Sequence, residues 1–132
     1  ILAGFYRAAA IGLVTPFHDG MNLVAKEYVA AQDPGDPGVL VLSEFAGAAR
    51  ELDAAVLVNP HDIDGMAEKL AGALAMPHAE RSERWTSLMA AVRKSSIHAW
   101  FSDFLTTLER AAPQRAPSVL DDFSDKGIPA AY

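Results

Sequence analysis

The sequence contains no cysteine, which excludes disulfide bonds, thiolate chemistry and cysteine-based zinc sites. It also lacks an apolar run near the roughly 20 residues that a membrane-spanning helix requires. The apolar stretch over residues 1–14 is interrupted by Arg7 and does not begin with Met, which argues against a signal peptide. From these absences we expect a cytoplasmic protein without a membrane segment, processed or derived from a longer chain.

A strong excess of basic charge is also missing. Lys and Arg number 11 against 17 Asp and Glu, so the formal net charge is −6, which argues against nucleic acid or a membrane surface as partner. The four histidines are spaced in no zinc-binding pattern, and we expect no metal site. Hydrophobic residues make up 51% of the 132 residues, which predicts one globular domain with a modest core.

Three short apolar runs alternate with helical patterns. This order predicts parallel strands joined by right-handed crossovers, an α/β fold with a Rossmann-like, doubly wound parallel sheet. Three strands make a thin sheet, and we expect further strands of the same sheet to precede residue 1. The predicted strands are residues 11–15, 39–42 and 55–58, and the predicted helices are residues 2–9, 22–31, 47–52, 62–76, 80–91 and 95–110.

The character of the sequence changes near residue 111. The last 22 residues contain three prolines, several Asp and Ser, and little periodicity. We therefore predict one domain over residues 1–110 and a tail over residues 111–132. Within the last predicted helix, apolar residues recur at helical spacing and favour docking on another domain, with packing on its own domain as the alternative.

The most informative segment runs from Thr15 to Glu27, from the end of a strand through a tight turn into a helix. In open α/β sheets, ligands bind at the carboxyl ends of the strands. The first N–H groups of a helix have no intrahelical partner, so a diphosphate is well placed there. Gly20 has no Cβ and permits close approach of a ligand, although turn geometry alone explains a glycine equally well.

Two carboxylates flank this turn, Asp19 before the helix and Glu27 in its second turn. Carboxylates accept hydrogen bonds from sugar hydroxyls, so one is suited to a ribose and the other to a transferred sugar. The alternative is that Asp19 helps cap the helix and that Glu27 is solvated or paired with a base.

Three motifs carry a family resemblance. Asp19-Gly-Met-Asn-Leu-Val-Ala-Lys-Glu-Tyr28, Ser43-Glu-Phe-Ala-Gly-Ala-Ala49 and Asn59-Pro60 resemble the C-terminal half of the trehalose-6-phosphate synthase family, in register over about residues 2–110. The resemblance implies the C-terminal domain of a GT-B fold, facing an N-terminal domain across a cleft. It also implies a retaining transfer of glucose from a nucleotide donor to glucose 6-phosphate without a metal or other cofactor, and it leaves a homo-oligomer open.

The resemblance also implies roles for single residues. Asp19 would contact the donor's sugar ring and is the catalytic candidate, while Glu27 would hold the ribose. Main-chain groups of the residues between them would line the donor ring and the diphosphate: Gly20, Met21, Asn22, Leu23 and Val24. The implied mechanism is a front-face displacement that needs no enzymic nucleophile, and we expect this chain alone to be inactive.

One residue departs from the family pattern. His18 stands where family members usually carry Arg, and it is a further candidate for contact with the diphosphate or the acceptor. The family includes a pseudoglycosyltransferase branch, the validoxylamine A 7′-phosphate synthases, which join GDP-valienol to validamine 7-phosphate through nitrogen. His18 and the Ala-, Gly-, Asp- and Pro-rich composition favour this branch slightly over an ordinary synthase, for which neutral drift explains the histidine.

Two other functions stay open. A domain of the same fold can bind a nucleotide and regulate without catalysing, or serve as an interaction domain without a ligand. Trp85 and Trp100 are interpreted as residues that pack helices onto a core. Arg81 and Arg84 are interpreted as part of a solvated helix face because acidic residues alternate with them.

Overall fold

The computed structural model describes residues 1–94 and 97–111. It divides into two units, residues 1–96 and residues 97–132, each of which is described by itself. The predicted tail beyond Ala111 lies outside the described residues, so the division at 110/111 stays a prediction. The first unit contains α1 (Leu2–Ala8), β1 (Ile11–Val14), α2 (Leu23–Ala31), β2 (Val39–Ser43), the 3₁₀ turn η1 (Gly47–Arg50), β3 (Val56–Val58), α3 (Ile63–Leu74) and α4 (His78–Lys94). The second unit contains α5 (Ile97–Ala111).

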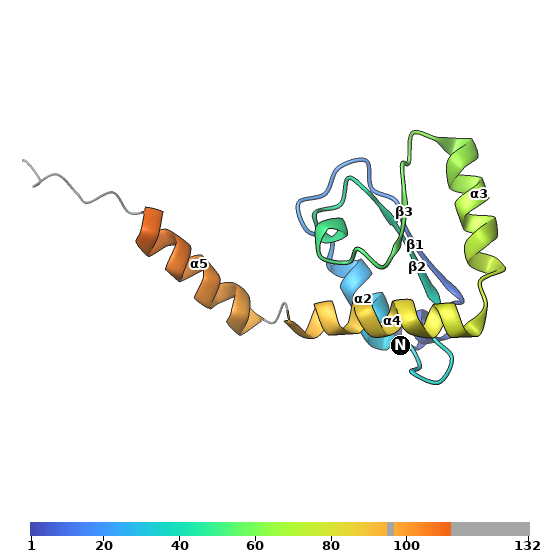
Figure 1. Cartoon of the computed structure of the whole chain (residues 1–132), viewed down its shortest axis with the longest axis horizontal. Helices are drawn as coiled ribbons and strands as arrows, with labels where there is room; N and C mark the ends of the chain where they lie inside the picture. The colour runs from blue at the N-terminus through green and yellow to red at the C-terminus, as the bar shows by residue number, and fades with distance from the viewer. Residues whose placement is uncertain (95–96, 112–132) are drawn as a thin grey trace, which may run out of the picture. The chain divides into compact units, whose positions relative to one another are not determined.

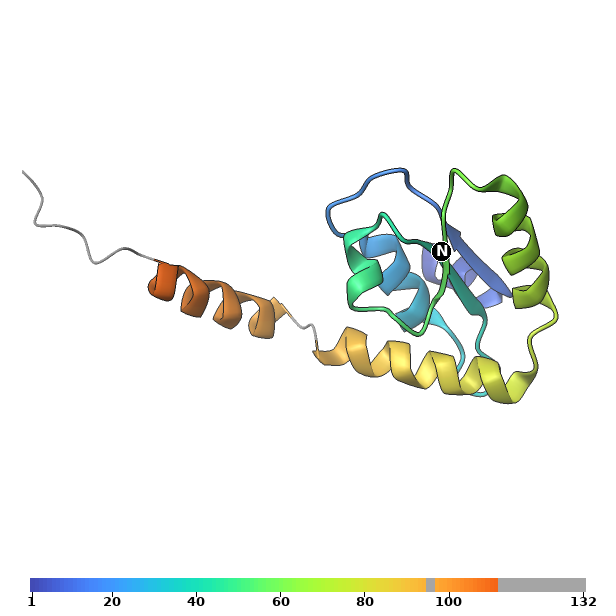
Figure 2. The same cartoon turned by 45° about the horizontal axis from the view of Figure 1, so that its top comes forward.

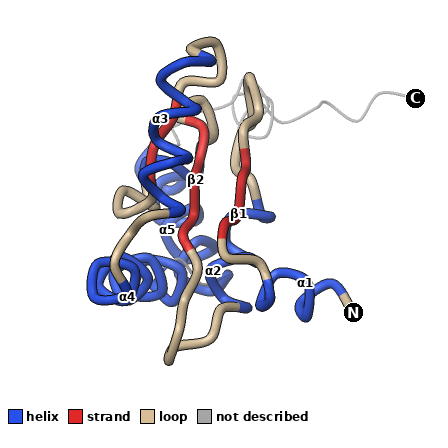
Figure 3. The backbone as a smooth tube through the Cα atoms, turned by 90° about the vertical axis from the view of Figure 1, so that its right-hand side faces the viewer, coloured by secondary structure: helices blue, strands red, loops and turns tan. Residues whose placement is uncertain are grey.

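The strands form one parallel sheet in the order β1-β2-β3. Ile11 pairs with Val39 at the start of the first ladder, and Val41 pairs with Val56 at the start of the second. Figure 3 shows β1 and β2 side by side. This sheet, with an α-helix after β1 and β3 and a 3₁₀ turn after β2, confirms the predicted α/β class.

Every residue of β2 is buried, because both faces of the sheet are covered. Leu40 and Leu42 face a core built with α2 and α4, while Val39 and Val41 face a second core with α3. Figures 1 and 2 show α2 and α3 on opposite sides of the sheet, which is the doubly wound arrangement.

The ends of the elements differ slightly from the prediction. The strand predicted to reach Thr15 ends at Val14, and β2 extends to Ser43. The predicted helix over residues 47–52 is a short 3₁₀ turn, with Ala49 and Glu51 donating to carbonyl groups three residues before them. These shifts leave the order of the elements unchanged.

Tyr28 seats α2 against β1. Its side chain is 2% exposed, and its hydroxyl donates to the carbonyl oxygen of Ala9 at 2.9 Å. A Cβ on Gly12 would lie 2.7 Å from the Tyr28 ring, so only glycine at this point of β1 lets the helix approach so closely. Burial raises the pKa of the Tyr28 hydroxyl to about 12. The position of α2 relative to the sheet is therefore set by this buried ring.

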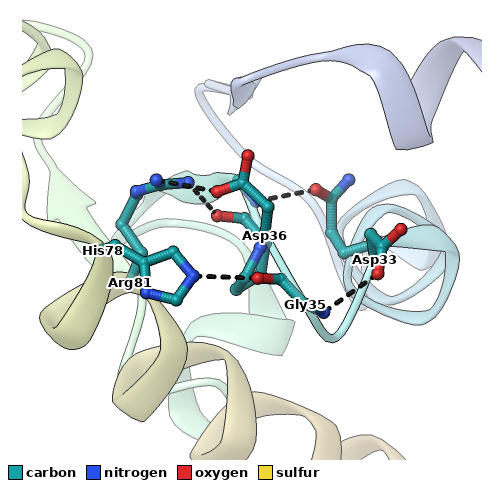
Figure 4. A network of polar contacts seen from close by, with 8 residues as sticks. Asp33, Gly35, Asp36, His78 and Arg81 are labelled. Carbon is teal, nitrogen blue, oxygen red and sulfur yellow. Dashed lines mark hydrogen bonds and ion pairs between the residues drawn. The ribbon is translucent and has the colours of Figure 1, made fainter.

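The turn between α2 and β2 is held by the first residues of α4 (Figure 4). Arg81 donates to the carbonyl oxygen of Pro37 at 2.6 Å and forms an ion pair with Asp36 at 2.8 Å. His78 Nε2 lies 2.9 Å from the carbonyl oxygen of Gly35. The interpretation of Arg81 as part of a solvated face is therefore wrong, because its guanidinium is engaged by a turn more than forty residues earlier in the chain.

Two further α4 residues attach this helix to the first core. Trp85 donates from its indole nitrogen to the carbonyl oxygen of Val29 at 3.0 Å, and it packs against the core as predicted. Arg84 donates to the carbonyl oxygen of Ala54 at 3.0 Å and pairs with Glu80 one turn away. Arg84, like Arg81, thus makes a tertiary contact. The alternation of charges along the helix does not predict it.

Helix α5 carries an apolar face, as the spacing predicts. Trp100 stacks on Phe104 with ring centroids 5.4 Å apart, and both side chains are about half exposed. Because α5 is described by itself, the expectation that Trp100 packs onto a core stays a prediction. Among the residues of α5 whose exposure is described, the other large exposed hydrophobic side chains are Phe101, Leu105 and Leu108. Over the described ranges, no helix combines the length and the hydropathy that crossing a bilayer requires.

Candidate functional site

The loop after β1 is fastened to the segment after β2. Asp19 and Ala46 form an isolated parallel bridge beyond the ends of the two strands. Gly47 donates to the carbonyl oxygen of Asp19 at 2.9 Å, and Ala48 donates to that of Met21 at 2.7 Å. The loop that the sequence singles out is therefore held by the backbone of the Ser43–Ala49 motif, at the carboxyl edge of the sheet.

The two glycines of this edge have different roles. A Cβ on Gly47 would overlap the carbonyl oxygen of Gly20, so the contact between the two segments requires glycine at residue 47. A Cβ on Gly20 would meet no atom within 4 Å, and its backbone does not have a positive φ. Neither turn geometry nor packing within the described residues thus calls for glycine at residue 20, which favours close approach of a ligand.

Asp19 is held by its own loop. One carboxylate oxygen accepts from the backbone N–H of Met21 at 3.1 Å, and the other accepts from the side-chain amide of Asn22 at 2.9 Å. The Met21 bond, followed by the Asn22 bond, lowers the pKa of the Asp19 carboxyl below its usual value. An ionised carboxylate has about four acceptor positions, so these two bonds leave capacity for ligand hydroxyls.

Asn22 caps α2. Its side-chain oxygen accepts from the backbone N–H of Ala25 at 2.9 Å. The N–H groups of Leu23 and Val24 come before that bond in the first turn, where helix geometry supplies no acceptor. Their side chains are 59% and 44% exposed, so the start of α2 is open. A helix start of this kind attracts an anion through its N–H groups and its dipole.

The remaining predicted residues lie beside this loop. His18 is exposed, and its charge makes a small contribution to lowering the pKa of Asp19. Glu27 is exposed one turn beyond Leu23, on the same side of α2. It lines a groove of about 440 Å³ between α1 and α2, together with Leu2, Ala3, Tyr6, Ala30 and Ala31. The two carboxylates therefore lie in different places: Asp19 lies in the turn before α2, and Glu27 lines the groove between α1 and α2.

An aromatic cluster at the same edge was missed by the sequence reasoning. The His61 ring lies 4.9 Å from the Phe17 ring and 5.7 Å from the Phe45 ring, between centroids. Each of these residues comes from the loop after a different strand, which is the signal that would have placed them together. The cluster joins all three loops of the edge.

An ion pair braces the first turn of α2 from the side. Lys26 Nζ lies 2.7 Å from a carboxylate oxygen of Glu51, and the lysine side chain is mostly buried. The pair links α2 to the segment after η1. Across residues 1–94 and 97–111, no three His, Asp or Glu side chains are grouped so that they could hold a metal ion.

Residues 2–110 match the family described as Glycosyltransferase family 20. Among curated proteins, the chain is 61% identical over 108 residues to the trehalose-6-phosphate synthase of Sinorhizobium fredii, covering 82% of this chain and 23% of that protein. It is 54% identical over 120 residues to the trehalose-6-phosphate synthase of an Enterobacter species, and the match covers 91% of this chain and 25% of that protein. The chain thus spans about a quarter of the length of these relatives.

Solved structures agree with the sequence matches. The UDP-forming trehalose-phosphate synthase of Burkholderia xenovorans, in complex with glucose 6-phosphate, superposes with a TM-score of 0.78 at 59% identity, covering 82% of this chain and 24% of that one. A structure from Escherichia coli described as bound with UDP-2-fluoro glucose gives the same TM-score at 52% identity, covering 83% and 24%. The described fold therefore recurs, at high identity, within much longer chains.

Proposed function

Because the chain belongs to glycosyltransferase family 20, we propose that it provides the donor-binding part of a retaining enzyme of the trehalose-6-phosphate synthase type. The proposed donor is UDP-glucose and the proposed acceptor is glucose 6-phosphate. Support comes from relatives that are described as UDP-forming and as bound to glucose 6-phosphate or to UDP-2-fluoro glucose. The acceptor pocket and the N-terminal domain of the GT-B fold would lie outside this sequence.

The observation that carries the proposal is the ionised Asp19 held beside the open start of α2. Asp19 would accept hydrogen bonds from hydroxyls of the transferred glucose, using the acceptor positions that Met21 and Asn22 leave. The N–H groups of Leu23 and Val24 would bind the diphosphate. Gly20 would let the donor ring lie against the main chain, and Glu27 would hold the ribose at the edge of its groove.

The chemistry follows from that placement. The bond between the anomeric carbon and the diphosphate oxygen breaks while the acceptor hydroxyl forms a bond to the same face of the carbon. The hydroxyl proton passes to the departing diphosphate, so no enzymic nucleophile is needed. Negative charge grows on that diphosphate in the transition state, and preoriented N–H groups and the dipole of α2 stabilise it.

The slight preference for the pseudoglycosyltransferase branch is not supported. It rests on His18 and on composition, whereas relatives at 54–61% identity are named trehalose-6-phosphate or trehalose-phosphate synthases. His18 is exposed, so the fold places little constraint on the residue type there. We therefore propose glucose transfer to oxygen as the reaction and interpret the histidine as a variation within it.

Calorimetric titration of the chain with UDP-glucose, GDP and GDP-valienol tests this proposal. We expect UDP-glucose to bind best, and Gly20→Ala to weaken its binding while leaving the melting temperature nearly unchanged, because a Cβ there meets no atom of the chain within 4 Å but would enter the proposed donor site. Gly72→Ala is the matched control, since a Cβ on that α3 residue also meets no atom within 4 Å. A preference for GDP-valienol, or equal binding by the Gly20 variant and the parent chain, would overturn the proposal.

A further inference from the structure

We propose that the Asn22 side chain is a positioning residue that couples the orientation of Asp19 to the first turn of α2. The group that receives the donor's hydroxyls and the N–H groups that receive its diphosphate would then be kept at a fixed spacing by one amide. This inference rests on the proposed function for its consequence in binding. The coupling itself concerns only the free protein and can be measured there.

The single amide of Asn22 makes two bonds in opposite senses. Its oxygen accepts from the backbone N–H of Ala25, and its nitrogen donates to the Asp19 carboxylate, both at 2.9 Å. Only this orientation of the amide satisfies both partners, because the Ala25 N–H requires an acceptor and the carboxylate requires a donor. Neither bond can be made by turning the amide over, so the side chain joins the helix and the carboxylate in one defined geometry.

The backbone of Asn22 supports the same role. Its φ of 78° and ψ of 88° make it the one residue other than glycine with a positive φ in the described part of the chain. Asn tolerates this region better than most residues, yet the conformation is still less favourable than ordinary helix or strand. Such strain persists where surrounding contacts determine it, and it is concentrated at functional sites. Here the contacts are the cap of α2 and the clamp on Asp19.

The choice of residue type follows from these two bonds. Aspartate at residue 22 would still cap the helix, but it has no N–H for Asp19 and would place a second negative charge beside it. Glycine would adopt the backbone without strain and would lose both side-chain bonds. Of these three residue types, only asparagine adopts the positive φ, caps the helix and donates a hydrogen bond to Asp19. The lowered pKa of Asp19 agrees with a clamp of this kind.

The experiment combines a carboxyl titration with ligand binding. The pKa of Asp19 is measured by NMR in the parent chain, in Asn22→Asp and in Asn22→Gly, and the affinities for UDP and UDP-glucose are measured in the same proteins. We expect the pKa of Asp19 to rise in both variants. UDP-glucose binding should weaken about tenfold more than UDP binding, because the bond lost at Asp19 is one to a charged group and serves the sugar.

Asp62→Ala is the matched control. Asp62 caps α3 by accepting from the N–H of Gly65 at 3.0 Å, the same kind of bond that Asn22 makes to α2, and it lies outside the proposed site. Its loss should lower stability without moving the pKa of Asp19 or the ratio of the two affinities. An unchanged Asp19 pKa in both Asn22 variants would overturn the coupling. Equal losses of UDP and UDP-glucose binding in the Asn22 variants would overturn the positioning role. If the parent chain binds neither ligand, that result counts against the proposed function, and the titration of Asp19 alone then decides whether the coupling exists.

Discussion

The carbonyl oxygen of Gly20 lies where a Cβ on Gly47 would stand, so the segments that follow β1 and β2 are in direct contact at this point. The contact comes with two backbone hydrogen bonds, from Gly47 to Asp19 and from Ala48 to Met21. A side chain at residue 47 would separate the segments, and these bonds would lengthen or break. The loop that holds Asp19 is therefore positioned by a glycine of a different motif.

Substitution of that glycine gives the first prediction. We expect Gly47→Ala to destabilise the chain by about 1–3 kcal/mol, the usual effect of overpacking, and to weaken UDP-glucose binding as well. Thermal unfolding and calorimetry measure the two effects. Gly72→Ala should be neutral or slightly stabilising, because alanine is a better helix former. A Gly47 variant as stable as the parent would show that the loop can move away from residue 47 without cost.

The second prediction concerns alkaline pH. The pKa of Tyr28 is raised from 10 in the unfolded chain to about 12 in the folded chain. The stability that depends on a protonated Tyr28 is therefore fully present below pH 10 and is lost as the pH rises through 12. A two-unit shift corresponds to roughly 2–3 kcal/mol at most. Urea unfolding at pH 8 and pH 11.5 should show a loss that Tyr28→Phe lacks. The phenylalanine variant should be about 1 kcal/mol less stable at pH 8, because the bond to Ala9 is gone. Parallel pH profiles for both proteins would contradict this assignment.

The third prediction concerns the aromatic cluster of Phe17, Phe45 and His61. We expect His61→Ala to speed amide hydrogen exchange in residues 15–22, because it removes a ring that contacts Phe17 in the loop after β1 and thereby adds the loop after β3 to its contacts. Global stability should change by less than about 1 kcal/mol, since the cluster is largely exposed. His78→Ala is the control, because that ring contacts the carbonyl oxygen of Gly35 in the turn before β2. Equal exchange in the two variants would show that the cluster does not hold the loop.

The fourth prediction concerns turnover. The isolated chain should not transfer glucose, because it spans about a quarter of its relatives. Residues 2–110, placed in the matching segment of the Burkholderia xenovorans synthase, should restore transfer from UDP-glucose to glucose 6-phosphate. Asp19→Asn in that chimaera should lower kcat/KM by at least about a hundredfold, the scale for losing a preorganised charged contact. Activity in the isolated chain would contradict the first expectation. A folded chimaera that binds UDP-glucose without transfer would favour a regulatory module.

Much of the fold was predictable because its signals are local. The run of Val39 to Leu42 is apolar without alternation, which is typical of a strand buried on both faces, and it forms the fully buried β2. Asn22 and Asp62 are residue types that favour helix N-caps, and both accept from the backbone N–H three residues later. Caps and apolar runs depend on residues a few positions apart, so the sequence displays them directly.

The contacts that the sequence did not reveal join distant residues. Arg81 is engaged by a turn 44 residues earlier, and its alternation with acidic neighbours resembles an ordinary solvated face. The link between Asp19 and Asn22 is short in sequence, yet it depends on the positive φ of Asn22, which residue type alone does not predict. The roles of Glu27 and of the other candidate donor contacts remain predictions, since they concern a ligand.

The bridge between Asp19 and Ala46 is a separate parallel pairing beyond the last residues of β1 and β2, and its register is displaced by one residue from that of the strands. The segment after β2 therefore carries the pairing partner of Asp19, so a displacement of β2 also acts on the loop that holds this carboxylate. A shift of β2 by one residue would exchange the side chains that face the two cores. It would also break the pairing of Asp19 with Ala46. We therefore expect core substitutions that displace β2 to weaken ligand binding, even where the altered residue lies outside the proposed site.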